Sequence, residues 1–271
     1  MDITEHLAAL RREGALLADA AARTDPGAPV PTCPDWRLRD LVLHTGQVHR
    51  WAAAHVRDGR RQPLDADGER AARGPEPSDG ELVDWFRAGH TALVEALAAA
   101  PADLDCWSFL PAPSPLAFWA RRQAHETAVH RFDADAAAGA AGPETAADLA
   151  LDGIDELLQG FMARSRARVR SEKPRTVLVR PTDGTVSWLL TIGPEPLTVT
   201  TADGAGHADG TEAADGTGAP ADLTPADLTL AGRARDLYLL LWNRLPAAQV
   251  ERTGDESLLD LWRETAVVRW S

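Results

Sequence analysis

The segment RRQAHETAVHRFD at residues 121–133 places a carboxylate and an imidazole four residues apart in a stretch with helical character. Positions i and i+4 of an α-helix differ by about 40° of rotation and about 6 Å of rise, so Glu126 and His130 project from the same side. Together they can offer an oxygen and a nitrogen to one cation. His125 lies about 140° around the helix from His130 and is not expected to join them. The spacing also differs from the H-E-x-x-H pattern of zinc proteases.

A catalytic zinc site normally has three protein ligands and an open position, so a third ligand should come from another helix. The stretch LVLHTGQVHRW at residues 41–51 offers two candidates, His44 and His49. Apolar residues surround His44, which predicts that it faces the interior of a helical bundle. Gly46 would let a neighbouring element approach closely at that point.

Two aspartates stand where they can orient these imidazoles. Asp40 lies one turn before His44, and Asp133 lies three residues after His130. Such outer acceptors fix the ring orientation of metal-bound histidines. The residues alone leave another interpretation open, in which His44 is a core histidine and the Glu126–His130 pair lies on a solvated helix face.

The sequence assigns no catalytic role to the remaining histidines, cysteines, arginines and tryptophans that were considered. Neither cysteine has a histidine partner nearby in sequence, and both are expected to be free thiols and not nucleophiles. The flanking arginines can hold an anionic substrate or pair with acids, and three tryptophans can line a pocket mouth. The sets are histidines 6, 49, 55, 90, 125 and 207 without a functional role, Cys33 and Cys106, Arg121, Arg122 and Arg131, and Trp36, Trp51 and Trp119.

Helical periodicity dominates the first part of the chain. Asp35 can cap the second helix, and the polar stretch 57–80 is expected to be an exposed loop. The predicted helices span residues 3–23, 36–56, 81–100, 116–138 and 146–168. The sequence therefore predicts an antiparallel helical bundle over residues 1–170.

The period changes in residues 171–271, which we predict to be a small α+β domain. Short apolar runs bounded by Gly, Pro or Asp indicate strands, and TDGT at 182–185 is a candidate hairpin turn. Residues 202–227 are rich in Gly, Ala, Asp and Thr and are expected to form a mobile loop. The predicted strands are 176–181, 186–192, 196–201 and 226–232, and the predicted helices are 233–245 and 257–268.

The charge and hydrophobicity of the chain exclude some classes of binding partner. The chain has 271 residues, a formal net charge of −13 and two cysteines. An acidic surface repels phosphate backbones and anionic lipids, so nucleic acid and membrane surfaces are poor partners. No apolar run approaches the roughly 20 residues that span a bilayer, and the N-terminus reads as an amphipathic helix and not a signal peptide. We therefore expect a cytoplasmic protein.

Two motifs together resemble one known family. VPTCPDWRLRDLVLHTGQVHRW at 30–51 and RRQAHETAVHRFD at 121–133 are similar to the signatures of the mycothiol-dependent maleylpyruvate isomerases, and DLTLAGRARDLYLLLWNRLP at 227–246 resembles their small C-terminal domain more loosely. The resemblance implies a DinB-like metal-binding N-terminal bundle with His44, Glu126 and His130 as metal ligands. Zinc is the expected metal, because a mixed N/O set with an open position suits it. Phe132 stands where relatives are expected to have Trp, a conservative change.

The resemblance further implies an enzyme that uses mycothiol and a divalent metal to act on a small electrophile. Metal coordination would deprotonate the thiol, which would then either catalyse cis–trans isomerisation or remain on the product in S-transfer. Arg235 or Arg244 can meet a substrate carboxylate. The alternatives are a non-catalytic metal-containing binding or sensing module, and a metal-assisted hydrolase with Asp40 or Asp133 as its base. Either a monomer or a homodimer is compatible with the sequence.

Overall fold

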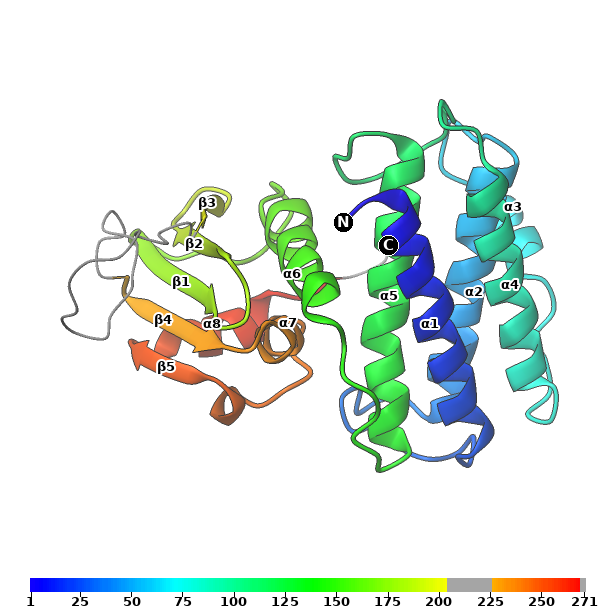
Figure 1. Ribbon diagram of the computed structural model, residues 1–271, viewed down its shortest axis with the longest axis horizontal. Helices are drawn as coiled ribbons and strands as arrows, with labels where there is room; N and C mark the ends of the chain where they lie inside the picture. Colours follow the sequence, from blue (N-terminus) through cyan, green and yellow to red (C-terminus); the bar gives the residue numbers. More distant parts are fainter. Residues whose placement is uncertain (204–225, 269–271) are drawn as a thin grey trace, which may run out of the picture. The chain divides into compact units, whose positions relative to one another are not determined.

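The computed structural model describes residues 1–203 and 226–268 and divides the chain into two compact units, Met1–Thr145 and Ala146–Ser271. The first unit is helical, and the second combines one sheet with helices (Figure 1). This confirms the predicted fold class, a helical bundle followed by a small α+β domain.

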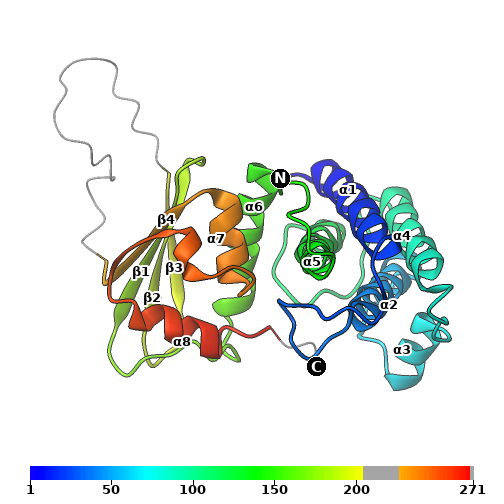
Figure 2. The same cartoon turned by 90° about the horizontal axis from the view of Figure 1, so that it is seen from below.

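Four long helices make up the body of the first unit. They pair as α1 with α5 and α2 with α4, and are also in contact as α1 with α4 and α2 with α5; Figure 2 views them roughly end-on. Their positions confirm four of the predicted helices. The bounds are α1 Ile3–Ala22, α2 Leu38–Arg57, α4 Leu82–Ala99 and α5 Pro115–Ala137. A short helix, α3 (Ala66–Arg73), lies in the stretch predicted to be a loop.

The helix starts follow local chemistry. Ser114 caps α5 and Pro115 occupies its first turn, where a missing N–H costs little. The start of α2 differs from expectation, because the helix begins after Arg37 and not at Asp35. The Asp40 carboxylate accepts a hydrogen bond from the Arg37 amide at 2.8 Å. Asp40 therefore closes the N-terminus of α2 and does not orient His44 as the sequence had suggested.

Two glycines admit side chains from α4. A Cβ atom at Gly46 of α2 would overlap the indole of Trp85, and one at Gly14 of α1 would overlap the imidazole of His90. The close approach expected at Gly46 is thus confirmed, and the neighbour is Trp85. The missing side chains let α4 pack tightly against both helices.

Helix α5 carries charged groups that are buried in pairs. Arg131 is 1% exposed, and its Nε donates to Glu13 of α1 at 2.8 Å while its Nη1 donates to Asp135 at 2.9 Å. Its Nη2 donates to the Thr145 hydroxyl at 2.9 Å. Glu13 also pairs with Arg12 at 2.7 Å, but Arg12 is 47% exposed. Of the flanking arginines, Arg131 therefore has a structural role in holding α1 to α5.

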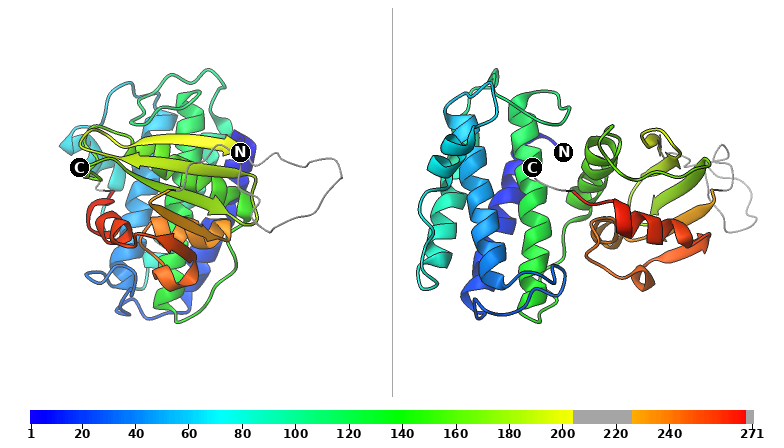
Figure 3. Two further views of the ribbon diagram at one scale, coloured as in Figure 1. Left: turned by 90° about the vertical axis from the view of Figure 1, so that its left-hand side faces the viewer. Right: turned by 180° about the vertical axis from the view of Figure 1, so that it is seen from behind.

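The second unit is built on a sheet with the strand order β3-β2-β1-β4-β5 among the described residues. β1 and β4 are parallel, and the other neighbours are antiparallel, including the predicted β1–β2 hairpin. In register, Val179 stands between Trp188 and Leu230, and all three are buried. Helix α7 packs against β1 and β4; Figure 3 gives two further views of the sheet and its helices. The bounds are β1 Arg175–Pro181, β2 Val186–Ile192, β3 Thr198–Asp203, β4 Leu228–Gly232, α7 Ala234–Leu241, β5 Glu251–Gly254 and α8 Ser257–Thr265.

The boundary between the units differs from the expected one near residue 170. Helix α6 (Ala147–Asp155) packs against α7, so it groups with the sheet and not with the bundle. It continues as a π-helix, Glu156–Met162, in place of a single α-helix to residue 168. Most of the loop predicted at 202–227 lies outside the described residues, although residues 202 and 203 belong to β3.

Within residues 1–203 and 226–268, none of the helices combines the length and the apolar character that a bilayer crossing requires.

Replacing Arg131 with Met should destabilise the first unit by about 3–5 kcal/mol, because it leaves Glu13 and Asp135 buried with too little compensating charge. The matched control is Arg12→Met, which removes the exposed partner of the same Glu13 and should cost less than about 1 kcal/mol. Urea unfolding of both variants measures the difference. Equal effects of the two substitutions would show that the buried network does not stabilise the bundle.

Candidate metal centre

Three side chains from two helices of the first unit converge: His44 from α2, and Glu126 and His130 from α5. Each can offer one ligand atom, and these atoms lie within 4.8 Å of one another. Nε2 of His44 is 3.4 Å from Oε1 of Glu126, and Nε2 of His130 is 3.3 Å from the same oxygen. The side chains are 26%, 4% and 9% exposed, respectively. The structure therefore brings together all three residues that the sequence singled out.

The donor set and its spacing fit a small divalent cation. Two imidazole nitrogens and one carboxylate oxygen are a typical catalytic zinc set. Metal–ligand distances of about 2.0–2.1 Å in a tetrahedral arrangement separate two ligand atoms by about 3.3–3.4 Å. The two distances to Glu126 match that separation without rearrangement.

Further hydrogen bonds hold the candidate ligands in place. His130 Nδ1 lies 2.9 Å from Asp133 Oδ2, which confirms the expected acceptor and turns Nε2 toward Glu126. Asp133 is itself fully buried and accepts a hydrogen bond from the Thr32 hydroxyl at 2.5 Å, while the Cys33 thiol is 3.7 Å from its Oδ2. These contacts tie the segment before α2 to α5. Sequence reasoning missed them, because nothing local links positions about 100 residues apart.

The surroundings favour a negative charge on Glu126 and a positive charge on His130. Burial acts to raise the pKa of Glu126, but hydrogen bonds from His130 and His44 and the charge of Arg122 outweigh it, so its pKa is well below the ordinary value. Burial acts to lower the pKa of His130, whereas Asp133 and Glu126 raise it to about 9. Arg122 Nη2 donates to the second oxygen of Glu126 at 3.1 Å, a pair that the i, i+4 spacing would have predicted. The carboxylates of Asp133 and Glu126 therefore favour positive charge at His130.

Trp36 covers two of the three candidate ligands. Its ring centroid lies 5.0 Å from that of His44 and 5.9 Å from that of His130. The indole is only partly buried. Of the three tryptophans considered for a pocket mouth, Trp36 is the one beside the triad; Trp51 and Trp119 belong to an aromatic cluster with Trp107 and His55.

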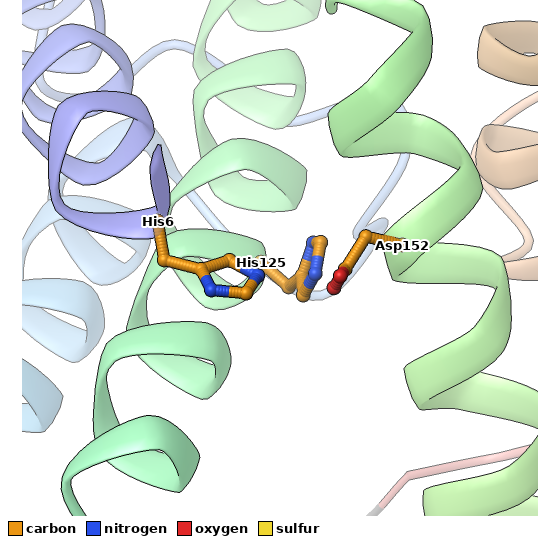
Figure 4. A group of neighbouring side chains, drawn as sticks. All are labelled: His6, His125 and Asp152. Carbon is orange, nitrogen blue, oxygen red and sulfur yellow. The ribbon is translucent and has the colours of Figure 1, made fainter. Parts of the chain in front are cut away.

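The other histidines lie outside the triad. His6 of α1 and His125 of α5 are buried with ring centroids 6.0 Å apart in an edge-to-face arrangement (Figure 4). His49 is fully buried, and its Nε2 lies 2.9 Å from the hydroxyl of Thr127. His90 Nε2 bonds the Leu10 carbonyl at 2.9 Å. His207 lies outside the described residues.

The remaining polar candidates have other partners. Both cysteines are free thiols, as expected. In the second unit, Arg235 of α7 pairs with Asp236 at 2.9 Å, and Arg244 donates to the Trp242 carbonyl at 2.9 Å. Of the two candidate hydrolase bases, Asp40 is an exposed cap and Asp133 is the buried partner of His130.

Comparisons with known proteins cover nearly the whole chain. The mycothiol maleylpyruvate isomerase N-terminal domain matches residues 7–135, and the MDMPI C-terminal domain matches residues 148–261. Among solved structures, the mycothiol-dependent maleylpyruvate isomerase aligns with a TM-score of 0.58, and a histidine-to-alanine mutant of such an isomerase with 0.61. Each of these two structures is 10% identical to this chain, and each alignment covers 93% of both chains. At this identity the likeness shows a shared fold. No curated protein sequence matches the chain.

The fully buried His49 should make the metal-free protein less stable in acid. Burial and the neighbouring His90 lower the pKa of His49 well below 6.5. As the pH falls below 6.5, His49 becomes protonated in the unfolded chain but stays neutral in the folded protein. The free energy of unfolding therefore decreases below pH 6.5, whereas above this value His49 has no such effect. In His49→Gln, the pH slope of the unfolding free energy between pH 6.5 and 5 should shrink by up to about 1.4 kcal/mol per pH unit. Urea unfolding at several pH values gives the slopes, and equal slopes would contradict the assignment.

Proposed function

Because the chain belongs to the mycothiol maleylpyruvate isomerase family, we propose that it is a metal-dependent enzyme that uses mycothiol to act on a small electrophile. The reaction is either a cis–trans isomerisation or a thiol S-transfer. The observation that carries the proposal is the convergence of His44, Glu126 and His130 at separations suited to one cation.

In this proposal the three side chains hold a divalent metal, with zinc as the first choice. A bound metal of this kind lowers the pKa of a coordinated thiol, so that the nucleophilic thiolate is present at neutral pH. Asp133 keeps the proton of His130 on Nδ1, which leaves Nε2 free to serve as a ligand. Arg122 neutralises the outer oxygen of Glu126 and leaves the inner one for the cation.

The open side of the triad is proposed to lie next to His44 and Trp36. His44 is the most exposed of the three ligands, and the partly buried indole faces it at 5.0 Å between centroids. An aromatic face can pack against a planar, unsaturated electrophile and exclude water from it. Trp36 would thus orient the substrate beside the position that the thiol sulfur occupies.

The competing functions differ in what they require of the thiol. A metal-containing binding or sensing module would keep the metal and turn over no pair of thiol and electrophile. A hydrolase would work without thiol. Its candidate bases have other roles, since Asp40 caps α2 and the Asp133 carboxylate is hydrogen-bonded to Thr32 and His130.

The proposal predicts about one equivalent of divalent metal in the untagged protein and activity that requires both metal and mycothiol. His44→Ala and Glu126→Gln should lose the metal and at least about 100-fold in activity, because two ligands do not hold a catalytic zinc. Elemental analysis and assays of a maleyl-type electrophile with and without mycothiol provide the measurement.

The matched control is Glu95→Gln, the same exchange at an exposed position of α4. It should retain both metal and activity. Metal-dependent turnover at the normal rate in both His44→Ala and Glu126→Gln would refute the site. Metal binding with no thiol-dependent turnover would favour the sensing module, and thiol-independent turnover would favour the hydrolase.

Removing the charge of Asp133 should weaken metal binding and leave the helices in place. Asp133→Asn can still accept a hydrogen bond from His130, but it no longer increases the basicity of the imidazole, so the metal affinity should fall about 10–100-fold. Competition with a chromogenic chelator measures it, with the exposed exchange Asp84→Asn as control. An unchanged affinity would show that Asp133 does not support the ligand.

A further inference from the structure

A separate cavity of about 200 Å³ lies entirely within residues of the second unit. Its walls come from the end of the π-helix, the turn that follows and the segment after α8. Three arginines of one short stretch line it: Arg164, Arg166 and Arg168. A cavity of this size holds a molecule of several heavy atoms, since one water takes about 30 Å³ in the liquid.

Arg164 is held in place with part of its guanidinium unused. Its Nε donates to the Phe161 carbonyl at 3.3 Å, and its guanidinium carbon lies 4.8 Å from the centroid of the Phe161 ring. Its Nη1 atom is buried and has no hydrogen-bond partner among the described residues. A buried N–H of a cation that lacks an acceptor is costly, so an acceptor is expected there.

The positive charge of this cavity is not balanced by neighbouring acids. None of the three arginines has a carboxylate within 4.0 Å among residues 1–203 and 226–268, although the chain carries a net charge of −13. Burial and the charge of Arg166 lower the pKa of Arg164 to about 10, and no acid acts in the opposite direction. By contrast, Arg175 of β1 contacts two aspartates. The cavity therefore attracts an anion.

The rest of the lining is largely apolar. Phe161 and Met162 are buried, and Val267 forms a wall while remaining 46% exposed. A charged head against Arg164 and a hydrocarbon tail against these side chains would satisfy both parts of the cavity. Inorganic phosphate offers the charge but no tail.

We infer that this cavity binds a small carboxylate with a short aliphatic chain. The carboxylate accepts hydrogen bonds from the Arg164 guanidinium, and the exposed lining residues Arg166 and Arg168 add positive potential. The site stands apart from the His44–Glu126–His130 triad in its residues and chemistry, and it goes beyond the proposed thiol-dependent reaction.

The experiment is a ligand-detected NMR titration of the full chain with butyrate, its neutral isostere butyramide, and inorganic phosphate. Butyrate should bind saturably, at least about tenfold more tightly than butyramide or phosphate. Arg164→Gln should weaken butyrate binding about tenfold or more, since it removes a charge-assisted hydrogen bond. Val267→Glu places a like charge at an exposed wall position and should have a similar effect without unfolding the protein.

The controls separate this site from others. Arg263→Gln, an exposed arginine of α8 that does not line the cavity, should bind butyrate normally. His44→Ala should also bind it normally, whereas an anion held by a metal at the triad would be lost. The inference is overturned by absence of saturable butyrate binding, by equal binding of butyramide or phosphate, by full binding in both Arg164→Gln and Val267→Glu, or by loss of binding in His44→Ala.

Discussion

The pairing of buried charges along α5 is the constraint on which the first unit depends. This helix buries polar side chains together with apolar ones, and a buried charge is tolerated only when it is paired and hydrogen-bonded. Arg131 meets Glu13 of α1 and Asp135 one turn further along α5. These bonds fix the rotation of α5 about its axis. Because His130 is the adjacent residue, the same rotation directs His130 and Glu126 toward His44 of α2.

The side chains of the candidate centre are arranged to favour positive charge between them. Glu126 is held ionised by two imidazoles on one oxygen and a guanidinium on the other. Nδ1 of His130 faces the Asp133 carboxylate and Nε2 faces the Glu126 carboxylate, so a proton on Nε2 and a metal would compete for the same nitrogen. A site already arranged for positive charge loses little conformational entropy when a cation replaces the proton. The hydrogen bonds among these side chains therefore support the ligand role that we propose.

Much of the fold and the triad followed from residue pattern. Apolar periodicity located α1, α2, α4 and α5, and the i, i+4 relation of Glu126 and His130 placed both on one side. The strands β1 to β4 also lie where apolar runs predicted them. Such signals succeed because burial forces side chains onto one face, and the period of that face appears in the sequence.

The elements that were missed have no such signal. Helix α3 buries none of its side chains, so it has no apolar stripe, and β5 joins the sheet edge through the backbone of the polar stretch ERTG. Asp40 was expected to orient His44, but its carboxylate accepts a hydrogen bond from the Arg37 amide in the same turn and closes the helix N-terminus. The contact of Thr32 with Asp133 joins distant segments, which only the tertiary structure brings together. From its sequence pattern, helix α6 was predicted to be a fifth helix of the bundle. Only its packing against α7 shows that it belongs to the second unit.

The interlocking of α4 with its neighbours has a consequence for how this chain can diverge. Trp85 fills the space above Gly46, and Gly46 is two residues from His44 on the same helix. If α4 slid along α2, the indole of Trp85 would collide with the backbone of α2. The contact between Trp85 and Gly46 therefore helps to fix the position of His44 along the helix axis. Positions 46 and 85 are thus expected to vary together: a side chain larger than glycine at position 46 is tolerated only with one smaller than tryptophan at position 85.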